Sequence, residues 1–267
     1  MGQAQRVPQF RCGIQNRYAA RMPRPPANPA APSVRHGVAR VISKLGLGSR
    51  TLAAQWVRAG RVRVNGKPVR DPEHPMRQGV DRLELDGRAV AAATRVVLML
   101  NKPRGLVTTR QDERGRATVY SCLTDPTLPW LAPVGRLDQA SEGLLLFSND
   151  PVWAAHLADP ATGPDKTYHV QIDRLPDAAL LARFERGVLV DGELLRFKSA
   201  RCLRAGRRHA WLEITLAEGR NRQIRRVLEA SGVSALRLLR VAIGTLALGR
   251  LAKGQWRLLS EPEIAAL

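Results

Sequence analysis

The protein is a chain of 267 residues in which 43 lysines and arginines face 23 aspartates and glutamates, a formal charge of +20. The first acidic residue is Asp71, so the first 70 residues carry +14 and the other 197 carry only +6. Such a block predicts a polyanionic partner, and nucleic acid is favoured over an anionic membrane because no apolar run approaches the ~18–20 residues of a spanning helix.

The basic N-terminal block divides into a tail and a module. Residues 1–33 hold six prolines and show no apolar periodicity, which predicts a disordered basic tail; the alternative is a start that comes from cloning or misannotation. Residues 34–92 show the patterns of a small compact module, and the run from Ala89 to Thr94 indicates a linker after it.

The module is predicted to contain two helices and a hairpin. Apolar residues at helical spacing begin at Val38 and end before Gly46, and Ser49 can cap a second helix. Asn65 and Gly66 lie within an alternating run, which is a strong hairpin signal. The polar side of these elements carries the basic residues that we expect to contact a nucleic-acid backbone, namely Arg40, Lys44, Arg50, Arg58, Arg61, Arg63 and Lys67.

This stretch resembles the αL RNA-binding module named after the fourth small-subunit ribosomal protein. The match rests on residues 38–69, VARVISKLGLGSRTLAAQWVRAGRVRVNGKPV. The module also occurs in proteins that catalyse nothing, so this resemblance implies RNA as a partner and implies no reaction.

A second domain is predicted over residues 95–267. Its strands are expected at residues 95–103, 143–148, 166–172 and 209–216, with a helix followed by a strand over residues 181–190 and a helix at residues 223–231. Strands outnumber helices and their connections are mostly short, so the predicted fold class is α+β. We expect a small α/β RNA-binding module followed by a domain with a mixed, largely antiparallel sheet flanked by helices.

Several kinds of chemistry lack their motifs in this sequence. The three cysteines form no CxxC pair, the five histidines are scattered, and no phosphate-binding GxxxxGK[ST] or strand-associated GxGxxG occurs. We therefore expect no metal and no cofactor. The cysteine usage also indicates a reducing cytoplasm.

Three segments carry candidate functional residues. Asp138 lies in a Gly-Arg-Leu-Asp turn before a very apolar strand; from local sequence alone it is either functional or an Asp turn that accepts backbone N–H bonds. Arg222, Arg225 and Arg226 lie on or near one face of a predicted helix. Tyr168 shares one side of a predicted strand with Lys166.

Together, these segments resemble the RsuA-type family of RNA pseudouridine synthases. The residues that match are GRLDQASEGLLLFSND at 135–150, LNKPRGLVTT at 100–109, DKTYHV at 165–170, and the two C-terminal motifs at 216–232 and 238–260. They occur in the family's order over residues 38–267. One departure is Pro151, where the family usually has glycine, and it is expected to alter a turn.

The resemblance implies an enzyme that isomerises uridine in RNA to pseudouridine without a metal or cofactor. Asp138 falls on the family's catalytic aspartate, Arg225 on its salt-bridge partner, and Tyr168 on the active-site tyrosine that stacks on the base. The aspartate acts as a nucleophile or through a glycal route, and the sequence leaves both open. The residues expected to bind substrate are Arg136, Lys102, Arg220 and Arg222 at phosphates and Leu246 in the pocket.

The expected partners are ribosomal RNA or ribosomal subunit assembly intermediates, with no membrane and a monomeric chain. The RNA-binding module indicates an enzyme of either ribosomal subunit, and the long basic tail favours the heavily structured large-subunit 23S RNA as substrate, with the small-subunit 16S RNA as the alternative. A non-catalytic ribosome-associated RNA-binding protein and a basic DNA-binding protein are the rival hypotheses.

Overall fold

The computed structural model describes residues 35–267, so the tail predicted over residues 1–33 lies outside the described part. Two helices and short strands form the first part of that chain, and their apolar side chains from Val38 to Leu83 pack into one cluster. The elements are β1 (Arg35–Gly37), α1 (Val38–Lys44), α2 (Arg50–Arg58), β2 (Val62–Val64), β3 (Lys67–Val69), β4 (Pro75–Arg77), β5 (Leu83–Leu85) and β6 (Arg88–Ala89).

The cap and turn residues predicted in this part adopt the predicted local structures. The Ser49 hydroxyl accepts a hydrogen bond from the backbone N–H of Leu52 at 3.0 Å, which caps α2. Asn65 and Gly66 both have positive φ, 51° and 78°, as a two-residue turn between β2 and β3 requires. Both helices and the hairpin are confirmed.

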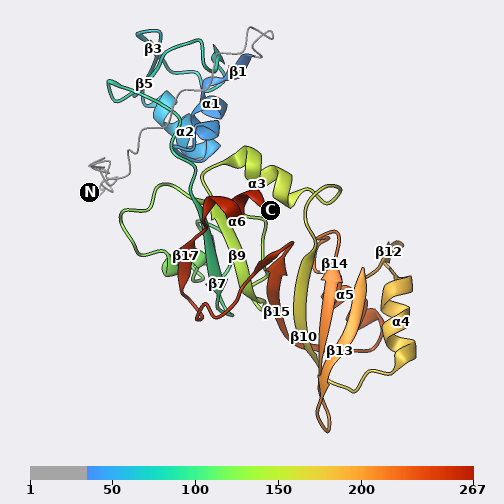
Figure 1. The fold of residues 1–267 in the computed structure, drawn as a ribbon. Coiled ribbons are helices and arrows are strands. Elements are labelled where there is room, and N and C mark those ends of the chain that lie inside the picture. Colours follow the sequence, from blue (N-terminus) through green and yellow to red (C-terminus); the bar gives the residue numbers. More distant parts are fainter. Residues whose placement is uncertain (1–34) are drawn as a thin grey trace, which may run out of the picture. The chain divides into compact units, whose positions relative to one another are not determined.

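Residues 96–267 form the second part, built on a nine-stranded sheet (Figure 1). Its main path runs β13-β14-β10-β15-β9-β7-β17, with β8 paired to β9 and β16 paired to β15. Within this sheet only β9 and β15 pair in parallel, so the predicted mixed, largely antiparallel α+β fold is confirmed. The strands are β7 (Val97–Lys102), β8 (Ala132–Val134), β9 (Glu142–Ser148), β10 (Lys166–Ile172), β13 (Ser199–Ala205), β14 (Ala210–Leu216), β15 (Ala235–Ile243), β16 (Leu246–Ala247) and β17 (Trp256–Leu258).

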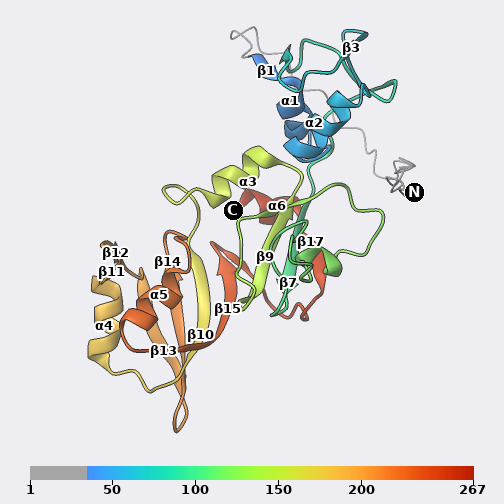
Figure 2. The same cartoon turned by 180° about the vertical axis from the view of Figure 1, so that it is seen from behind.

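The helices and a small hairpin flank this sheet. Helix α5 covers one face of strands β10, β14 and β13: it lies in front of them in Figure 2 and behind them in Figure 1. Strands β10 and β14 alternate between buried and half-exposed residues, and their buried residues share a core with Phe184 of α4 and Ile224 of α5. The elements are η1 (Val119–Cys122), α3 (Pro151–Ala158), α4 (Ala178–Arg186), β11 (Val188–Val190), β12 (Glu193–Leu195), α5 (Gln223–Ala230) and α6 (Glu261–Ala265).

Gly143 allows β9 and β15 to approach closely. Its φ is +100°, and a Cβ at this position would overlap the backbone oxygen of Arg240 on β15. Only glycine meets both conditions without strain. This parallel contact brings the loop before β9 next to β15.

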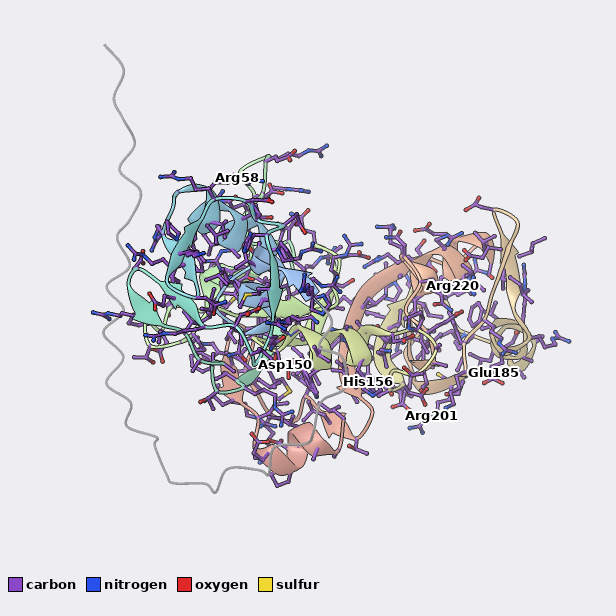
Figure 3. All side chains as sticks on the ribbon, turned by 90° about the horizontal axis from the view of Figure 1, so that it is seen from above. Arg58, Asp150, His156, Glu185, Arg201 and Arg220 are labelled. Atoms are coloured by element: carbon purple, nitrogen blue, oxygen red, sulfur yellow. The ribbon has the colours of Figure 1, made fainter. Side chains whose placement is uncertain are left out.

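Pro151 does more than alter a turn. It is the first residue of α3, where its missing N–H costs nothing, and the Asp150 carboxylate accepts hydrogen bonds from the N–H groups of Val152 and Trp153 at 3.0 Å each. Figure 3 labels Asp150 and His156 near the two ends of this helix. Among residues 35–267, no helix is both long enough and apolar enough to cross a membrane.

Candidate active site

The loop between β8 and β9 carries Asp138. It is fastened to the loop after β7 by Gln139, whose backbone oxygen accepts from Gly105 N–H at 2.8 Å, and by the Thr108 hydroxyl, which donates to the Leu137 carbonyl at 2.7 Å. No hydrogen bond or ion pair from the described residues reaches the Asp138 carboxylate, which is half-buried. The backbone around the carboxylate is therefore held while its oxygens stay available.

Lys102, the last residue of β7, holds this loop through hydrogen bonds to its backbone. Its side chain is fully buried, and its ammonium donates to the carbonyls of Pro103, Asp138 and Ser141 at 3.2, 3.1 and 2.8 Å. Burial lowers the pKa of Lys102 to about 8. Because this value is still above neutral pH, the ammonium keeps its three N–H donors there. The prediction of a phosphate contact at Lys102 is wrong, because its three N–H groups are already used inside the protein.

Asp138 faces a cavity of about 300 Å³. That volume is at the low end of the range of roughly 300–1,000 Å³ for small-molecule sites, which suits a single base. Among the residues that the structure describes, six basic side chains line the cavity, and Asp138 is the only carboxylate there. The charged lining residues are Arg136, Asp138, Lys166, Arg220, Arg222, Arg225 and Arg240.

Arg225 lies in this cavity but does not form the predicted ion pair with Asp138. Its guanidinium instead donates to the carbonyls of Ala235 and Ala140, at 3.2 and 3.4 Å. Burial is the main cause of a lowered pKa at Arg225, followed by repulsion from Arg222, while Asp138 raises it. The buried Nε of Arg225 has no partner among the described residues, so one donor is left at the cavity wall.

Tyr168 of β10 lies in the same cavity, as predicted, with its side chain 8% exposed. Two basic residues that the sequence analysis did not select join it. Lys166 lies two residues earlier on the same strand, and Arg240 on β15 is paired directly opposite Tyr168. The sequence of β15 contains two arginines, Arg237 and Arg240, and only the strand pairing shows that Arg240 is the one opposite Tyr168.

Leu246 does not line the cavity. It packs in the core with Val97, Leu144 and Ile264, on β16. The apolar wall of the cavity comes instead from Leu238 and from the residues Leu137, Leu216, Ile224 and Ile243. The prediction at Leu246 is wrong because β16 pairs with Ala242 and Ile243 at the end of β15, and the Leu246 side chain belongs to this core instead of the cavity lining.

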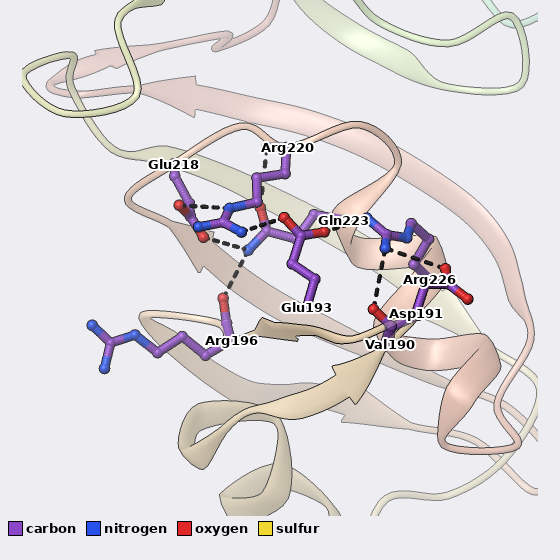
Figure 4. Close-up of polar contacts among 8 residues, drawn as sticks. All are labelled: Val190, Asp191, Glu193, Arg196, Glu218, Arg220, Gln223 and Arg226. Atoms are coloured by element: carbon purple, nitrogen blue, oxygen red, sulfur yellow. Dashed lines mark hydrogen bonds and ion pairs between the residues drawn. The ribbon is translucent and has the colours of Figure 1, made fainter.

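Figure 4 shows how the segment before α5 is fixed. Glu193 of β12 pairs with Arg220 and, at 2.9 Å, with Arg226. Gln223 donates to the Arg196 carbonyl at 2.9 Å and accepts from the Arg220 N–H at 3.2 Å. Arg220 and Arg226 thus position the rim of the cavity.

Arg222 and Arg136 remain open to solvent at the cavity. Arg222 has a φ of +50° just before α5, and its nearest carboxylate partner is Glu229 at 3.8 Å. Arg136 is exposed beside Asp138. Both stay candidates for phosphate contacts.

The basic residues predicted on the N-terminal module are mostly exposed. Two have partners within the module: Lys44 contacts His36 at 3.0 Å, and Arg61 forms an ion pair with Asp86 at 2.5 Å. The remaining five, which are exposed, are Arg40, Arg50, Arg58, Arg63 and Lys67.

Residues 35–267 contain no group of three or more histidine, cysteine, aspartate or glutamate side chains placed to hold a metal ion. In this described part, the polar lining of the cavity consists of arginine, lysine, tyrosine, serine, asparagine and glutamine side chains and a single carboxylate. A ligand in this cavity is therefore surrounded by positive charge and lies close to the Asp138 carboxylate.

Comparison with known proteins places the chain. Residues 96–230 match the family described as RNA pseudouridylate synthase, and residues 38–81 match the S4 domain. The ribosomal large subunit pseudouridine synthase B of Xanthomonas campestris pv. campestris is 35% identical over 253 residues, which cover 90% of this chain and 50% of that protein. This chain therefore spans about half the length of that relative.

Two other matches extend over nearly whole chains. The protein of the same name from Bacillus subtilis is 34% identical over 231 residues, which cover 85% of this chain and 93% of that one. A crystal structure of a pseudouridylate synthase superposes with a TM-score of 0.61 at 28% identity, covering 88% of this chain and 99% of that one. The resemblance seen in the sequence is confirmed, and the chain belongs to the RNA pseudouridylate synthase family, with an S4 domain before the synthase domain.

Proposed function

We propose that this protein isomerises specific uridines in ribosomal RNA to pseudouridine and that Asp138 is its catalytic carboxylate. One observation carries the proposal: among the described residues, Asp138 is the only acid in a base-sized cavity, and the six other charged side chains that line it are all basic. The cations attract an RNA backbone, and the unpaired carboxylate is left to react.

The reaction breaks the bond between ring nitrogen 1 of uracil and the anomeric carbon of ribose. The base then turns, and ring carbon 5 forms the new bond to the same carbon while losing its proton, so the product is an isomer. Asp138 acts either as a nucleophile or by assisting departure of the base through a glycal. Tyr168, whose hydroxyl has no hydrogen-bond partner among residues 35–267, lies against the base and can take part in the proton transfer.

The target nucleotide has to leave its stack to reach this site, because a half-buried carboxylate in a cavity cannot reach a stacked base. Arg222 and Arg136 at the rim are suited to hold the phosphates that flank the extruded nucleotide. Arg225 lines the same cavity and holds the backbone carbonyl of Ala140, two residues after Asp138.

The substrate that we favour is large-subunit 23S RNA. The relatives from Xanthomonas campestris and Bacillus subtilis carry names that refer to the large ribosomal subunit. The S4 domain supplies a second, exposed basic surface for binding structured RNA. We further propose that the chain acts as a monomer in the cytoplasm, on ribosomal RNA or subunit assembly intermediates.

The test uses the full chain with unmodified 23S and 16S RNA transcribed in vitro, followed by pseudouridine-specific chemical mapping. We expect pseudouridine at defined positions of 23S RNA. Product only in 16S RNA would move the substrate to the small subunit. Tight RNA binding without any product would support the non-catalytic alternative and contradict the proposal, and equal affinity for duplex DNA would support the DNA-binding rival.

A further inference from the structure

The sheet has a second face, opposite the one that α5 covers, and a row of side chains crosses it. Arg204 of β13 is paired with Trp211 of β14, Trp211 with Gln171 of β10, and Gln171 with Arg237 of β15. Residues paired directly across strands point to the same face. The four side chains therefore form one line on the face away from the buried Val170 and Leu212.

Trp211 is the centre of this line. The guanidinium carbons of Arg204 and Arg237 lie 5.3 and 5.6 Å from its ring centroid, within the range of cation–π contacts. Arg237 is also held by the Glu142 carboxylate, with its Nε and Nη2 each 3.1 Å from an oxygen. Guanidinium and indole planes are thus positioned before any ligand arrives.

The neighbouring hairpin adds charge without opposing acid. Arg207 and Arg208 are exposed in the loop between β13 and β14, and neither forms an ion pair with the described residues. Two carboxylates on this face are already paired with cations: Glu213 with Arg201, and Glu142 with Arg237 and Lys253. A hollow at this end of the sheet is lined by Gln171, Arg204, Ala205, Gly206, Arg207, Arg208, His209 and Trp211.

We propose that this surface, defined by Gln171, Arg204, Arg207, Arg208, Trp211 and Arg237, binds a single-stranded segment of the RNA substrate outside the target nucleotide. The inference rests on the proposed function and deepens it. Arg207 and Arg208 hold phosphates, while a base stacks on the arginine and tryptophan planes. An acidic protein is the alternative ligand. It would pair with the arginine charges, but it has no bases to stack on the guanidinium and indole planes.

The surface is separate from the cavity of Asp138. Tyr168 and Arg240 project to the side of the sheet that α5 covers, whereas Gln171 and Trp211 project to the other. A strand held here cannot place its own base against Asp138. Its contribution is to affinity and to the choice of the flanking sequence.

Four variants of the full chain test the proposal. They are the surface pair, Arg207→Ala with Arg208→Ala; Trp211→Ala; Trp211→Phe; and a control pair, Arg183→Ala with Arg186→Ala, which removes two exposed arginines of α4 that form no ion pair among the described residues. The probes are single-stranded oligouridylate and unmodified 23S RNA, and equilibrium affinity is measured over a series of salt concentrations. Trp211→Phe keeps an aromatic plane and guards against loss of the fold.

The surface pair is expected to reduce the salt dependence of oligouridylate binding by about 1.4 in log–log slope, because each lost phosphate contact is worth about 0.7 for single strands. Trp211→Ala should weaken binding about tenfold and Trp211→Phe much less. The control pair should match the wild type. Equal effects of the surface and control pairs, or unchanged affinity in a folded Trp211→Ala, would overturn the proposal.

Pseudouridine formation is followed in the same samples, which separates the two proposals. A wild type that forms no product but shows the expected differences in affinity would contradict the proposed function and leave this surface standing. Product formation with no differences in affinity would do the reverse.

Discussion

The charged groups of Lys102 and Arg225 donate hydrogen bonds to backbone carbonyls. The sequence instead predicts a phosphate contact for Lys102 and an ion pair with Asp138 for Arg225. Lys102 reaches the carbonyls of Asp138 and Ser141, and Arg225 reaches that of Ala140. Both therefore fix the backbone of the loop that carries Asp138. A carboxylate held this way needs no ion pair of its own to stay in place.

Replacing Lys102 tests this support. Lys102→Met keeps the buried aliphatic stem but removes three donors, so the carbonyls of Pro103, Asp138 and Ser141 lose their partner. The free energy of unfolding should fall by about 2 kcal/mol, measured by urea denaturation, and activity should fall in the protein that remains folded. Full activity in a stable Lys102→Met variant would contradict the supporting role.

The family resemblance, and not the local sequence alone, led to the prediction of Asp138 and Tyr168 as site residues, because the motifs that match are short and contiguous. It did not predict the role of Lys102, whose partners Asp138 and Ser141 are 36 and 39 residues away. Arg240 was missed for the same reason, since only the pairing of β15 with β10 places it opposite Tyr168.

At the scale of elements, the contact between β9 and β15 decides where the catalytic loop lies. Gly143→Ala introduces a Cβ that overlaps the Arg240 backbone oxygen, at a φ of +100°. We expect a loss of about 3 kcal/mol or more in unfolding free energy, from backbone strain and overpacking together. Thermal denaturation measures it, with Gly249→Ala as the matched control: that glycine also has a positive φ, +62°, but its Cβ would have open space. Equal losses in the two variants would contradict the steric argument.

Glu142, at the start of β9, gives this contact a pH dependence. Burial raises its pKa, but the hydrogen bonds from Arg237 and Lys253 outweigh burial, and the pKa is lowered from 4.5. The unfolded chain therefore binds this proton first as the pH falls, so the stability from Glu142 is complete above about pH 4.5 and is lost below it. Glu142→Gln should be less stable near neutral pH and should lose less stability on acidification. The unfolding free energy of both proteins is measured as the pH is lowered. An equal loss of stability in the wild type and in Glu142→Gln would contradict this role of Glu142.

Elements with strong local signals were predicted, and those defined by partners were not. The hairpin of β2 and β3 follows from Asn65 and Gly66 alone. In contrast, β8 is three residues long and exists through its pairing with β9. Helix α6 has a capping box at Ser260 and Glu263, a signal that the sequence analysis did not use.

At the scale of the whole molecule, delivery to RNA and chemistry belong to different residues. Every residue that lines the Asp138 cavity lies between Val134 and Ile243. Removing residues 1–92 should therefore weaken RNA binding and lower its salt dependence while leaving single-turnover activity at saturating enzyme. Complete loss of that activity in a truncated chain with an intact fold would contradict the separation.

The central claim is that Asp138 performs the chemistry. The measurement is single-turnover pseudouridine formation in 23S RNA by Asp138→Asn, beside Glu113→Gln, which makes the same acid-to-amide change at an exposed residue. We predict that the rate falls by roughly 10⁴-fold or more in Asp138→Asn, with RNA affinity retained, and that it is unchanged in Glu113→Gln. Pseudouridine formation by Asp138→Asn at a rate close to that of the wild type would contradict the account.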